Sequence, residues 1–270
     1  MLPRLIATVV LTLALATPAW AAGYRDAVDA YNRGDYAEAF KAWKPFAEDG
    51  NPMAEFILGV MYERGQGTEK DYGQAFEWYG RAARGGEAAA QFSLARMYFY
   101  GQGIAQNYGE AEKWFQKAAK EGWPEAQTRL AFMYYNEDGV SRDLAKAADY
   151  ALQAAQANQL RAQELLARLY YHGQGVPRDV KEAERWLRPA AGQGDAEAQL
   201  FLAKICAEGE AFPMDYVQAH MWTSLALLKL TSSQKRDVAA AYLVYLTGQM
   251  TAAQIEEAEG LARDWTPTKP

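Results

Sequence analysis

The sequence has very little of the chemistry that enzyme and metal sites need. Its 270 residues include one cysteine, Cys206, and two histidines, His172 and His220. One cysteine excludes an intramolecular disulfide, and neither histidine has a second ligand at the spacing of a metal site. Cys206 lies on an apolar helix face without an identifiable base nearby, so we interpret it as a buried small hydrophobic residue. We therefore predict no catalytic residue, no metal and no cofactor, and we expect the protein not to be an enzyme.

The chain also lacks an excess of positive charge. It has 28 basic and 34 acidic residues, which gives a formal net charge of −6 at pH 7. Nucleic acids and anionic membranes are bound through a cationic field, because their phosphates repel an acidic protein. We therefore expect no nucleic-acid partner and no attraction to an anionic membrane surface.

The sequence does contain one motif that repeats five times. Leucine recurs every 36 residues, and an alanine precedes each leucine by four residues. The leucines are Leu58, Leu94, Leu130, Leu166 and Leu202, and the alanines are Ala54, Ala90, Ala126, Ala162 and Ala198. Within one copy, Ala54, Leu58 and Tyr62 follow the spacing i, i+4, i+8, which places them on one face of a helix. Each copy is therefore predicted to begin with an amphipathic helix.

A second helix is predicted in each copy. The pair Gly65 and Gly67 ends the first helix and turns the chain, because glycine adopts the left-handed conformation at little cost. A helix-starting residue then recurs at Asp71, Asn107, Asp143, Asp179 and Asp215, and a large ring at Trp78, Trp114, Tyr150, Trp186 and Trp222. With Gln74, Asp71 would form a capping box, and the ring is expected to be buried between the helices.

These motifs resemble those of a known repeat family. The copies follow the motif A-x-x-x-L-[GA]-x-x-Y-x-x-G-x-G and then the motif D-x-x-x-A-x-x-W-x-x-x-A-A-x-x-G. Over about residues 52–229 the chain therefore resembles the Sel-one-like repeat family, which is a relative of the tetratricopeptide repeat. The resemblance implies an all-α, right-handed α-solenoid of antiparallel helix pairs that acts as a scaffold or adaptor. It does not identify the partner.

The five repeats are expected to lie between a leader, two caps and a tail. We assign residues 1–21 to a signal peptide, 22–51 to an N-terminal capping partial repeat, 52–229 to the repeats, and 230–270 to C-terminal capping helices and a short tail, expected to be disordered. In the last segment, Thr251 and Gln254 match a capping box. An apolar face is expected to seal the last repeat, and it consists of Ile255, Ala258, Leu261, Ala262 and Trp265.

The leader has the parts of a secretory signal. Arg4 supplies a basic start, residues 5–16 form an apolar run, and small residues precede a cut between Ala21 and Ala22. A retained membrane anchor is the alternative, but the apolar run is too short to span a bilayer comfortably. We therefore expect a periplasmic or secreted protein that has no membrane span after the signal is removed.

Positions that vary between repeats are the place to look for a binding surface, because the constant positions are committed to packing. In folds related to the resembled family, the first helices line the concave wall of the array. The candidate partner-binding residues there are Arg96, Phe99, Arg129, Phe132, Tyr135, Arg168, Tyr171 and Lys204. Such a groove suits an extended peptide with acidic or aromatic side chains, since arginine and tyrosine often carry binding energy. The alternative is that the cations only solvate a helix face and the rings pack between repeats.

Together these features indicate an exported scaffold that binds a protein or peptide partner, in the assembly or regulation of a bacterial cell-envelope system. Two other functions stay open. The aromatic groove could bind a glycan such as peptidoglycan or exopolysaccharide. A disulfide-rich branch of the resembled family is linked to β-lactam hydrolysis, but its paired cysteines are absent here and we expect no Ser-x-x-Lys nucleophile.

Overall fold

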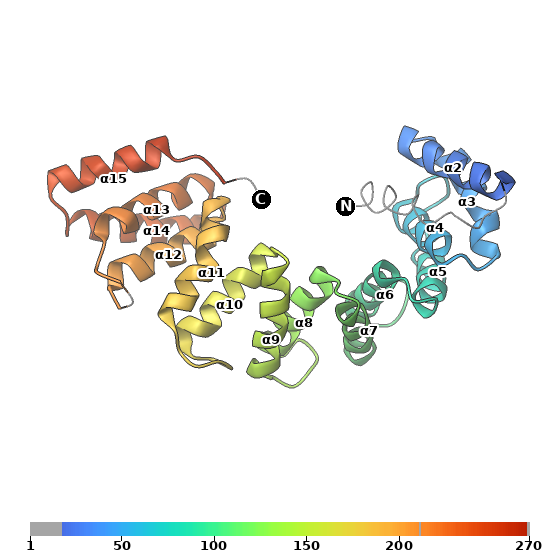
Figure 1. Ribbon diagram of the computed structural model, residues 1–270, viewed down its shortest axis with the longest axis horizontal. Coiled ribbons are helices and arrows are strands. Elements are labelled where there is room, and N and C mark those ends of the chain that lie inside the picture. Colours follow the sequence, from blue (N-terminus) through green and yellow to red (C-terminus); the bar gives the residue numbers. More distant parts are fainter. Residues whose placement is uncertain (1–17, 211, 269–270) are drawn as a thin grey trace. The chain divides into compact units, whose positions relative to one another are not determined.

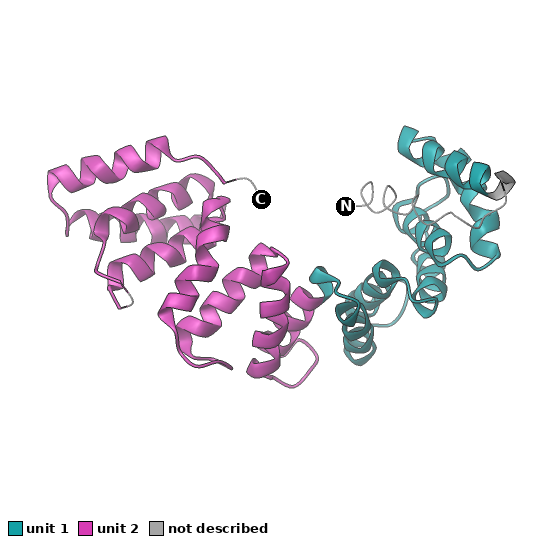
Figure 2. Cartoon of the chain, in the orientation of Figure 1, with its two compact units in different colours: residues 1–126 teal, residues 127–270 magenta. Residues whose placement is uncertain are grey.

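The computed structural model describes residues 18–210 and 212–268, and all regular structure within them is α-helical (Figure 1). The helices are α2 (Pro18–Arg33), α3 (Tyr36–Glu48), α4 (Pro52–Arg64), α5 (Tyr72–Arg84), α6 (Ala88–Tyr100), α7 (Tyr108–Lys120), α8 (Pro124–Asn136), α9 (Leu144–Gln156), α10 (Leu160–His172), α11 (Val180–Gly192), α12 (Ala196–Glu208), α13 (Tyr216–Lys229), α14 (Ser233–Thr247) and α15 (Ala252–Asp264). They fall into two compact units, residues 1–126 and 127–270 (Figure 2). The predicted all-α solenoid of helix pairs is confirmed.

Each repeat pairs a first helix with a second helix that follows it. In unit 1 the repeat pairs are α4 with α5 and α6 with α7, and in unit 2 they are α10 with α11 and α12 with α13. The leucines at 58, 94, 130, 166 and 202 are all buried, and so are the alanines four residues before them. The repeated columns of the first helices are therefore the core, which confirms the 36-residue register.

The second helices begin at the predicted caps. The Asp71 carboxylate accepts a hydrogen bond from the Gln74 backbone N–H at 3.0 Å, and this bond satisfies one of the donors that a helix start leaves open. Asn107, Asp143, Asp179 and Asp215 make the same type of bond. At Asp71 only this first bond is formed, whereas Thr251 and Gln254 complete a reciprocal capping box.

Of the five rings expected to be buried in the second helices, Trp222 is buried, but the rings of the other four copies are only half-buried. Trp78 and Trp114 are only half-buried, and their rings lie beneath the Arg81 guanidinium and the Lys117 ammonium at 4.5 Å and 3.7 Å. The position after each ring is the fully buried one, and it holds Tyr79, Phe115, Ala151, Leu187 and Thr223. Trp78 and Tyr79 stand three and four residues after Ala75, and both spacings keep to one helix face, so the packing of neighbouring helices decides that Tyr79 is the buried one.

A buried polar residue recurs once in the first helix of each repeat, and the sequence patterns did not reveal it. It consists of Glu55, Gln91, Gln127, Gln163 and Gln199, each 36 residues after the last. The side-chain amide of Gln199 donates to the Ala191 carbonyl at 3.0 Å, and Gln163 does the same to Ala155. Gln91 makes the same type of bond to Ala83, and each of these three carbonyls also accepts a backbone N–H from the turn that follows its helix. The Gln127 amide instead donates to Gln153 at 3.3 Å.

The second glycine of the loop is required by a close approach. At Gly103 φ is +74°, and a Cβ atom there would lie 2.3 Å from the Tyr72 carbonyl oxygen at the start of α5. Gly67 and Gly175 make the equivalent approach to Tyr36 and Leu144. The loop of each of these repeats therefore rests directly on the second helix of the repeat before it.

The N-terminal segment of unit 1 contributes to the same hydrophobic core as the repeats that follow it. In it the buried rings of Tyr24 and Trp43 meet edge to face, with centroids 4.8 Å apart. Residues 1–17, which hold most of the expected signal peptide, lie outside the described part of the chain, and α2 begins at Pro18 and continues past the expected cut at Ala21.

At the other end of the chain, α15 packs on α13. Ala258 is buried, and Trp265 meets Trp222 edge to face at 6.5 Å. Within the expected tail, the Thr268 N–H donates to the Gly192 carbonyl at 2.8 Å, and residues 269–270 lie outside the described part of the chain. Among the described helices, none combines the length and apolar character that crossing a bilayer requires.

Candidate functional site

The two candidate residues in unit 1 take part in internal contacts. The Arg96 guanidinium pairs with Glu63 at 2.5 Å, and the other oxygen of Glu63 accepts a hydrogen bond from the Tyr79 hydroxyl at 2.6 Å. Burial, followed by the nearby Glu63 carboxylate, raises the pKa of Tyr79 well above its usual value. Phe99 is buried, with its ring 5.0 Å from that of Tyr108. The Arg96–Glu63 pair links the two repeats of unit 1, whereas the other two contacts each lie within one repeat.

Three candidate residues of unit 2 lie on α8. Arg129, Phe132 and Tyr135 are all half-buried. The Arg161 guanidinium lies over the Phe132 ring at 4.8 Å, and the Arg142 guanidinium lies 5.9 Å from the Tyr135 centroid. Both rings therefore meet cations supplied by the same unit.

The remaining candidates, on α10 and α12, come together in part. Arg168 pairs with Glu164 at 2.8 Å within α10. Tyr171 donates its hydroxyl to Glu208 at 2.5 Å, and the Lys204 ammonium lies 4.9 Å from the Tyr171 ring centroid and 3.7 Å from Glu208. Burial, and then the bond to Glu208, raise the pKa of Tyr171. Tyr171 and Lys204 thus form one cluster, joined through Glu208.

This cluster borders an open groove between α12 and α14. The groove has a volume of about 370 Å³ and is lined by Leu200, Lys204, Ala207, Glu208, Val238, Ala239, Tyr242 and Tyr245. The rings of Tyr242 and Tyr245 are stacked with centroids 6.2 Å apart, and burial raises the pKa of Tyr242 to about 12. The lining is mainly apolar, with one cation and one carboxylate on the α12 wall.

The α14 wall of the groove was missed by the sequence patterns. A signal for it was present, because Val238 and Tyr242 stand 36 residues after Leu202 and Cys206, and Thr251 stands 36 residues after Asp215. The 36-residue spacing therefore continues into α14 and α15 as a degenerate sixth copy in sequence, although Val238 is 66% exposed where the earlier leucines are buried. Its loop lacks the glycine pair, which is why the motif does not extend to it.

The groove has no reactive group suited to covalent chemistry. Cys206 is half-buried, and burial raises its pKa to about 11, so it is a neutral thiol at pH 7. Contrary to expectation, the sequence does contain one Ser-x-x-Lys, from Ser232 to Lys235. Its serine caps α14, and the Lys235 ammonium pairs with Glu197 at 2.5 Å instead of with the serine. Within the described residues no acidic, histidine or cysteine cluster is arranged to hold a metal ion.

The chain is similar to known repeat proteins. The family model for the Sel1 repeat matches five times, at residues 52–87, 88–123, 124–159, 160–195 and 196–229. A crystal structure of a Sel1 repeat protein from Oxalobacter formigenes is 30% identical, has a TM-score of 0.72, and aligns over 77% of this chain and 85% of its own.

Two more distant structures also match the chain. A protective antigen of uropathogenic Escherichia coli with an SLR fold is 24% identical over 91% of this chain and 68% of its own, with a TM-score of 0.42. A Sel1 repeat protein from Klebsiella pneumoniae is 20% identical over 77% of this chain and 99% of its own, with a TM-score of 0.44. No curated protein matches the sequence.

Proposed function

Because the chain belongs to the Sel1 repeat family, we propose that it is an exported scaffold that binds a protein or peptide partner through the first helices of its repeats. Sel1 repeats are a protein-interaction fold, and proteins built from them are generally non-enzymatic. The finer proposal concerns the site, the partner and the compartment.

The groove between α12 and α14 is the main support for the proposed location of the binding site. It is open and mainly apolar, and two tyrosines lie on its α14 wall. Tyrosines at such a site supply large contact area with little loss of conformational freedom, which is why they are frequent in interfaces. Lys204 and Glu208 on the opposite wall add one charge of each sign. A peptide with apolar or aromatic anchors, and with an acidic side chain near Lys204, matches this lining.

The choice of Lys204 over the arginines rests on their partners. Arg96 and Arg168 each have a carboxylate neighbour, Glu63 and Glu164, within 2.8 Å. Charge reversal at either arginine would set two carboxylates side by side, so a loss of binding could not be separated from a loss of stability. Lys204 is half-exposed and its nearest carboxylate, on Glu208, is 3.7 Å away, so it can be neutralised at small cost.

For the compartment, we propose the bacterial periplasm and a role in assembling or regulating an envelope system. The support is the order of basic, apolar and small residues over positions 1–21. Mass spectrometry of the protein purified from the envelope tests this part. A mature N-terminus at Ala22 is expected, and an intact Met1 in a cytoplasmic fraction would contradict it.

The binding proposal is tested by site-specific photo-crosslinking in cells of the source organism. A photoreactive phenylalanine derivative replaces Tyr242 in the groove, and a matched control places it at Glu257, which is exposed on α15. We expect one envelope protein to crosslink from position 242, not from 257, and to be lost when Lys204 is changed to Gln.

Equal crosslinking from both positions, or capture that Lys204→Gln leaves unchanged, would remove the groove as the site. Retention of the pure protein on peptidoglycan or exopolysaccharide, with no protein crosslinked, would favour the glycan-binding alternative.

A further inference from the structure

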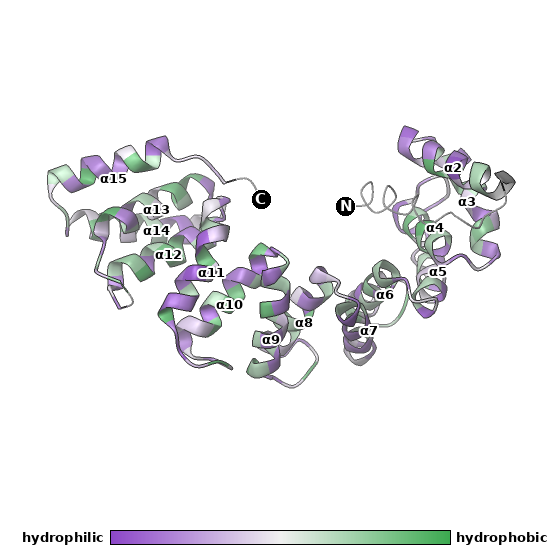
Figure 3. Ribbon diagram, viewed as in Figure 1, coloured by the Kyte–Doolittle hydropathy of each residue, from purple (hydrophilic) through white to green (hydrophobic). Residues whose placement is uncertain are grey.

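Two successive second helices of unit 1, α5 and α7, share an exposed face that is cationic, although the chain as a whole is acidic. Three exposed positions recur on each helix at the spacing i, i+4, i+7, which places them on one side. They hold Glu77, Arg81 and Arg84 on α5, and Lys113, Lys117 and Lys120 on α7, and we call these six residues the cationic face. It carries five cations and one carboxylate, whereas the formal net charge of the chain is −6. Figure 3 shows α7 as a mainly hydrophilic helix.

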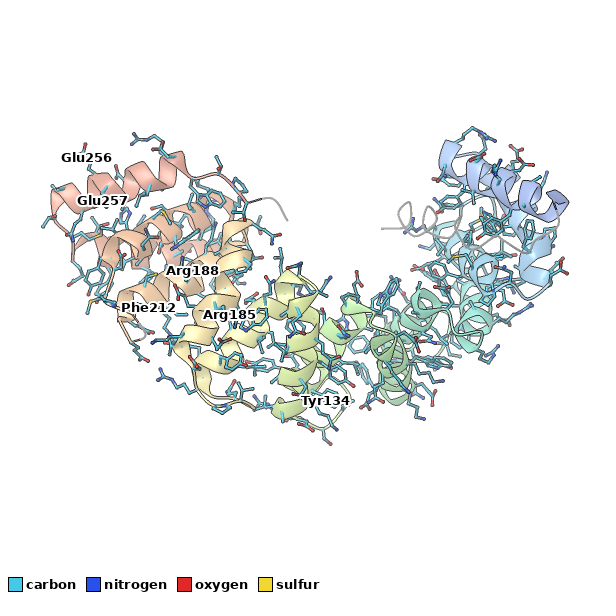
Figure 4. All side chains as sticks on the ribbon, viewed as in Figure 1. Tyr134, Arg185, Arg188, Phe212, Glu256 and Glu257 are labelled. Carbon is cyan, nitrogen blue, oxygen red and sulfur yellow. The ribbon has the colours of Figure 1, made fainter. Side chains whose placement is uncertain are left out.

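The equivalent positions of the other second helices are not cationic. They hold Lys41, Pro45 and Glu48 on α3, Asp149, Gln153 and Gln156 on α9, Arg185 (labelled in Figure 4), Pro189 and Gly192 on α11, and Met221, Leu225 and Leu228 on α13. Basic residues in the last turn stabilise a helix through its dipole. Helices α3, α9 and α11 have the same length as α5 and α7 and carry no basic residue there. The helix dipole therefore does not explain the cations of α5 and α7.

Three cations of this face have no carboxylate partner. Arg81 pairs with Glu55 at 2.9 Å, and Lys113 pairs with Glu110 at 2.7 Å. Within the described residues, no ion pair involves the other three, which are Arg84, Lys117 and Lys120. All three lie in the C-terminal halves of their helices. This end of the cationic face is therefore open to an external anion.

A groove lined by aromatic rings lies beside these cations. It has a volume of about 320 Å³, and it is bordered by Arg84 of α5 and by Trp114 of α7. Phe76 and Tyr98 also line it, and their rings meet edge to face with centroids 5.2 Å apart. Gly80 borders the same groove and has no side chain to fill it. The groove therefore has room for an apolar or aromatic side chain next to a guanidinium.

Trp114 connects this groove to the lysines of α7. It borders a second hollow of about 370 Å³, together with Lys117 and Lys120. The Lys117 ammonium lies 3.7 Å from the centroid of the Trp114 ring. Glu110 lines this hollow too, but its carboxylate pairs with Lys113. A ligand that covers Trp114 thus reaches both the aromatic groove and the unpaired lysines.

The chemistry of this lining favours an acidic peptide over a sugar or a nucleic acid. Guanidinium and ammonium groups form strong charge-assisted hydrogen bonds with carboxylates, and rings bury apolar side chains. A bound sugar has many hydroxyls that need hydrogen-bond partners, yet the side-chain acceptors in the described lining of the groove are the Glu77 carboxylate and the Tyr98 hydroxyl. A nucleic acid or another long polyanion would extend beyond these two helices and be repelled by the net charge of −6.

From these observations we propose that the cationic face binds an acidic peptide segment of a partner. An apolar or aromatic side chain of the segment enters the groove beside Trp114, and its carboxylates meet Arg84, Lys117 and Lys120. Recognition of acidic motifs by clustered cations is a common mode of peptide binding. Glu77 lies seven residues before Arg84, toward the other end of α5, so it does not separate the unpaired cations. The site belongs to second helices of unit 1 and does not rest on the groove between α12 and α14.

Fluorescence anisotropy of the purified protein tests the charge requirement. The probe is a fluorescein-labelled, end-capped peptide with two glutamates on each side of one phenylalanine, and the same peptide with glutamines is its neutral control. We expect saturable binding of the acidic peptide only, weakened by salt. Arg84→Gln combined with Lys120→Gln should weaken it about tenfold. The matched control combines Arg236→Gln with Lys181→Gln, which removes the same charges from exposed positions of unit 2 and should leave binding unchanged.

Filling the groove tests the requirement for a ring. Gly80→Gln places in α5 the residue that α7 has at the same position, Gln116. A Cβ atom at Gly80 would lie 3.4 Å from the Arg84 guanidinium, which is an ordinary contact, and glutamine favours a helix more than glycine does, so the variant should fold. Its affinity for the phenylalanine peptide should fall to that for the same peptide with alanine. Gly109→Gln, outside the groove, is the matched control and should have no effect.

Several outcomes would overturn the proposal. These are no saturable binding of the acidic peptide, equal weakening by the two charge-removing pairs, and unchanged affinity in Gly80→Gln. Binding that Lys204→Gln abolishes, while the Arg84 and Lys120 variant retains it, would place the peptide in the groove between α12 and α14 instead. Binding of polygalacturonate through Arg84 and Lys120, with no peptide bound, would replace the peptide by an acidic glycan. Crosslinking from position 242 reports separately on the proposed function, because Tyr242 does not border the cationic face.

Discussion

Replacing Leu130 by alanine measures how much the repeated leucine column contributes to stability. Leu130 is fully buried, with 0% of its surface exposed, in the first helix α8. The change removes three carbon atoms, which corresponds to about 2.4 kcal/mol of transfer free energy at about 0.8 kcal/mol per methylene. The cavity left behind adds to this, so we expect the free energy of unfolding to fall by roughly 2–5 kcal/mol.

The assay is urea unfolding followed by far-UV circular dichroism, with the slope compared between variants because repeat arrays can lose cooperativity. Leu228→Ala is the matched control, since that leucine is 82% exposed and the same atoms are removed. It should cost less than about 0.5 kcal/mol. If Leu130→Ala costs no more than this control, the burial of the leucine column and the register built on it are wrong.

Three further predictions concern other parts of the chain. Burial raises the pKa of Tyr24 to about 12. Because an unfolded tyrosine titrates near about 10, the free energy of unfolding should fall as the pH rises from about 10 to about 12. Tyr24→Phe should reduce that fall when urea unfolding is measured across this pH range. Burial raises the pKa of Cys206 to about 11, so a disulfide reagent near neutral pH should label the native protein far more slowly than the urea-unfolded protein, and equal rates would show the thiol to be free. Gly103→Ala should lower the thermal midpoint more than Gly86→Ala, because both positions have positive φ but only at Gly103 would the new Cβ meet a carbonyl, that of Tyr72, at 2.3 Å; equal midpoints would contradict the close approach of the loop.

The candidate site could be predicted only in part. Sequence patterns selected Tyr171 and Lys204 because they vary at fixed positions of the repeat, and the structure joins them through Glu208. The same patterns selected Phe99, and both Phe99 and Tyr171 are buried. A variable position can face a partner or a neighbouring repeat, and spacing along one helix does not distinguish the two. The α14 wall was missed because its repeat is degenerate, with Val238 where the earlier copies have leucine.

The sequence by itself determined the architecture of the repeats. Their period, helix pairs, caps and buried leucines follow from local rules, since each depends on residues within one turn or one repeat of each other. The tertiary structure alone decided which neighbouring position of the second helix is buried, as at Trp78 and Tyr79, and where Arg96 finds its carboxylate. It also decided that Val238 and Val244 of α14 are exposed while Ala239 and Leu246 of the same helix are buried. These features depend on how helices rotate against their neighbours, and that rotation is set by packing over the whole unit rather than by the pattern of any one helix.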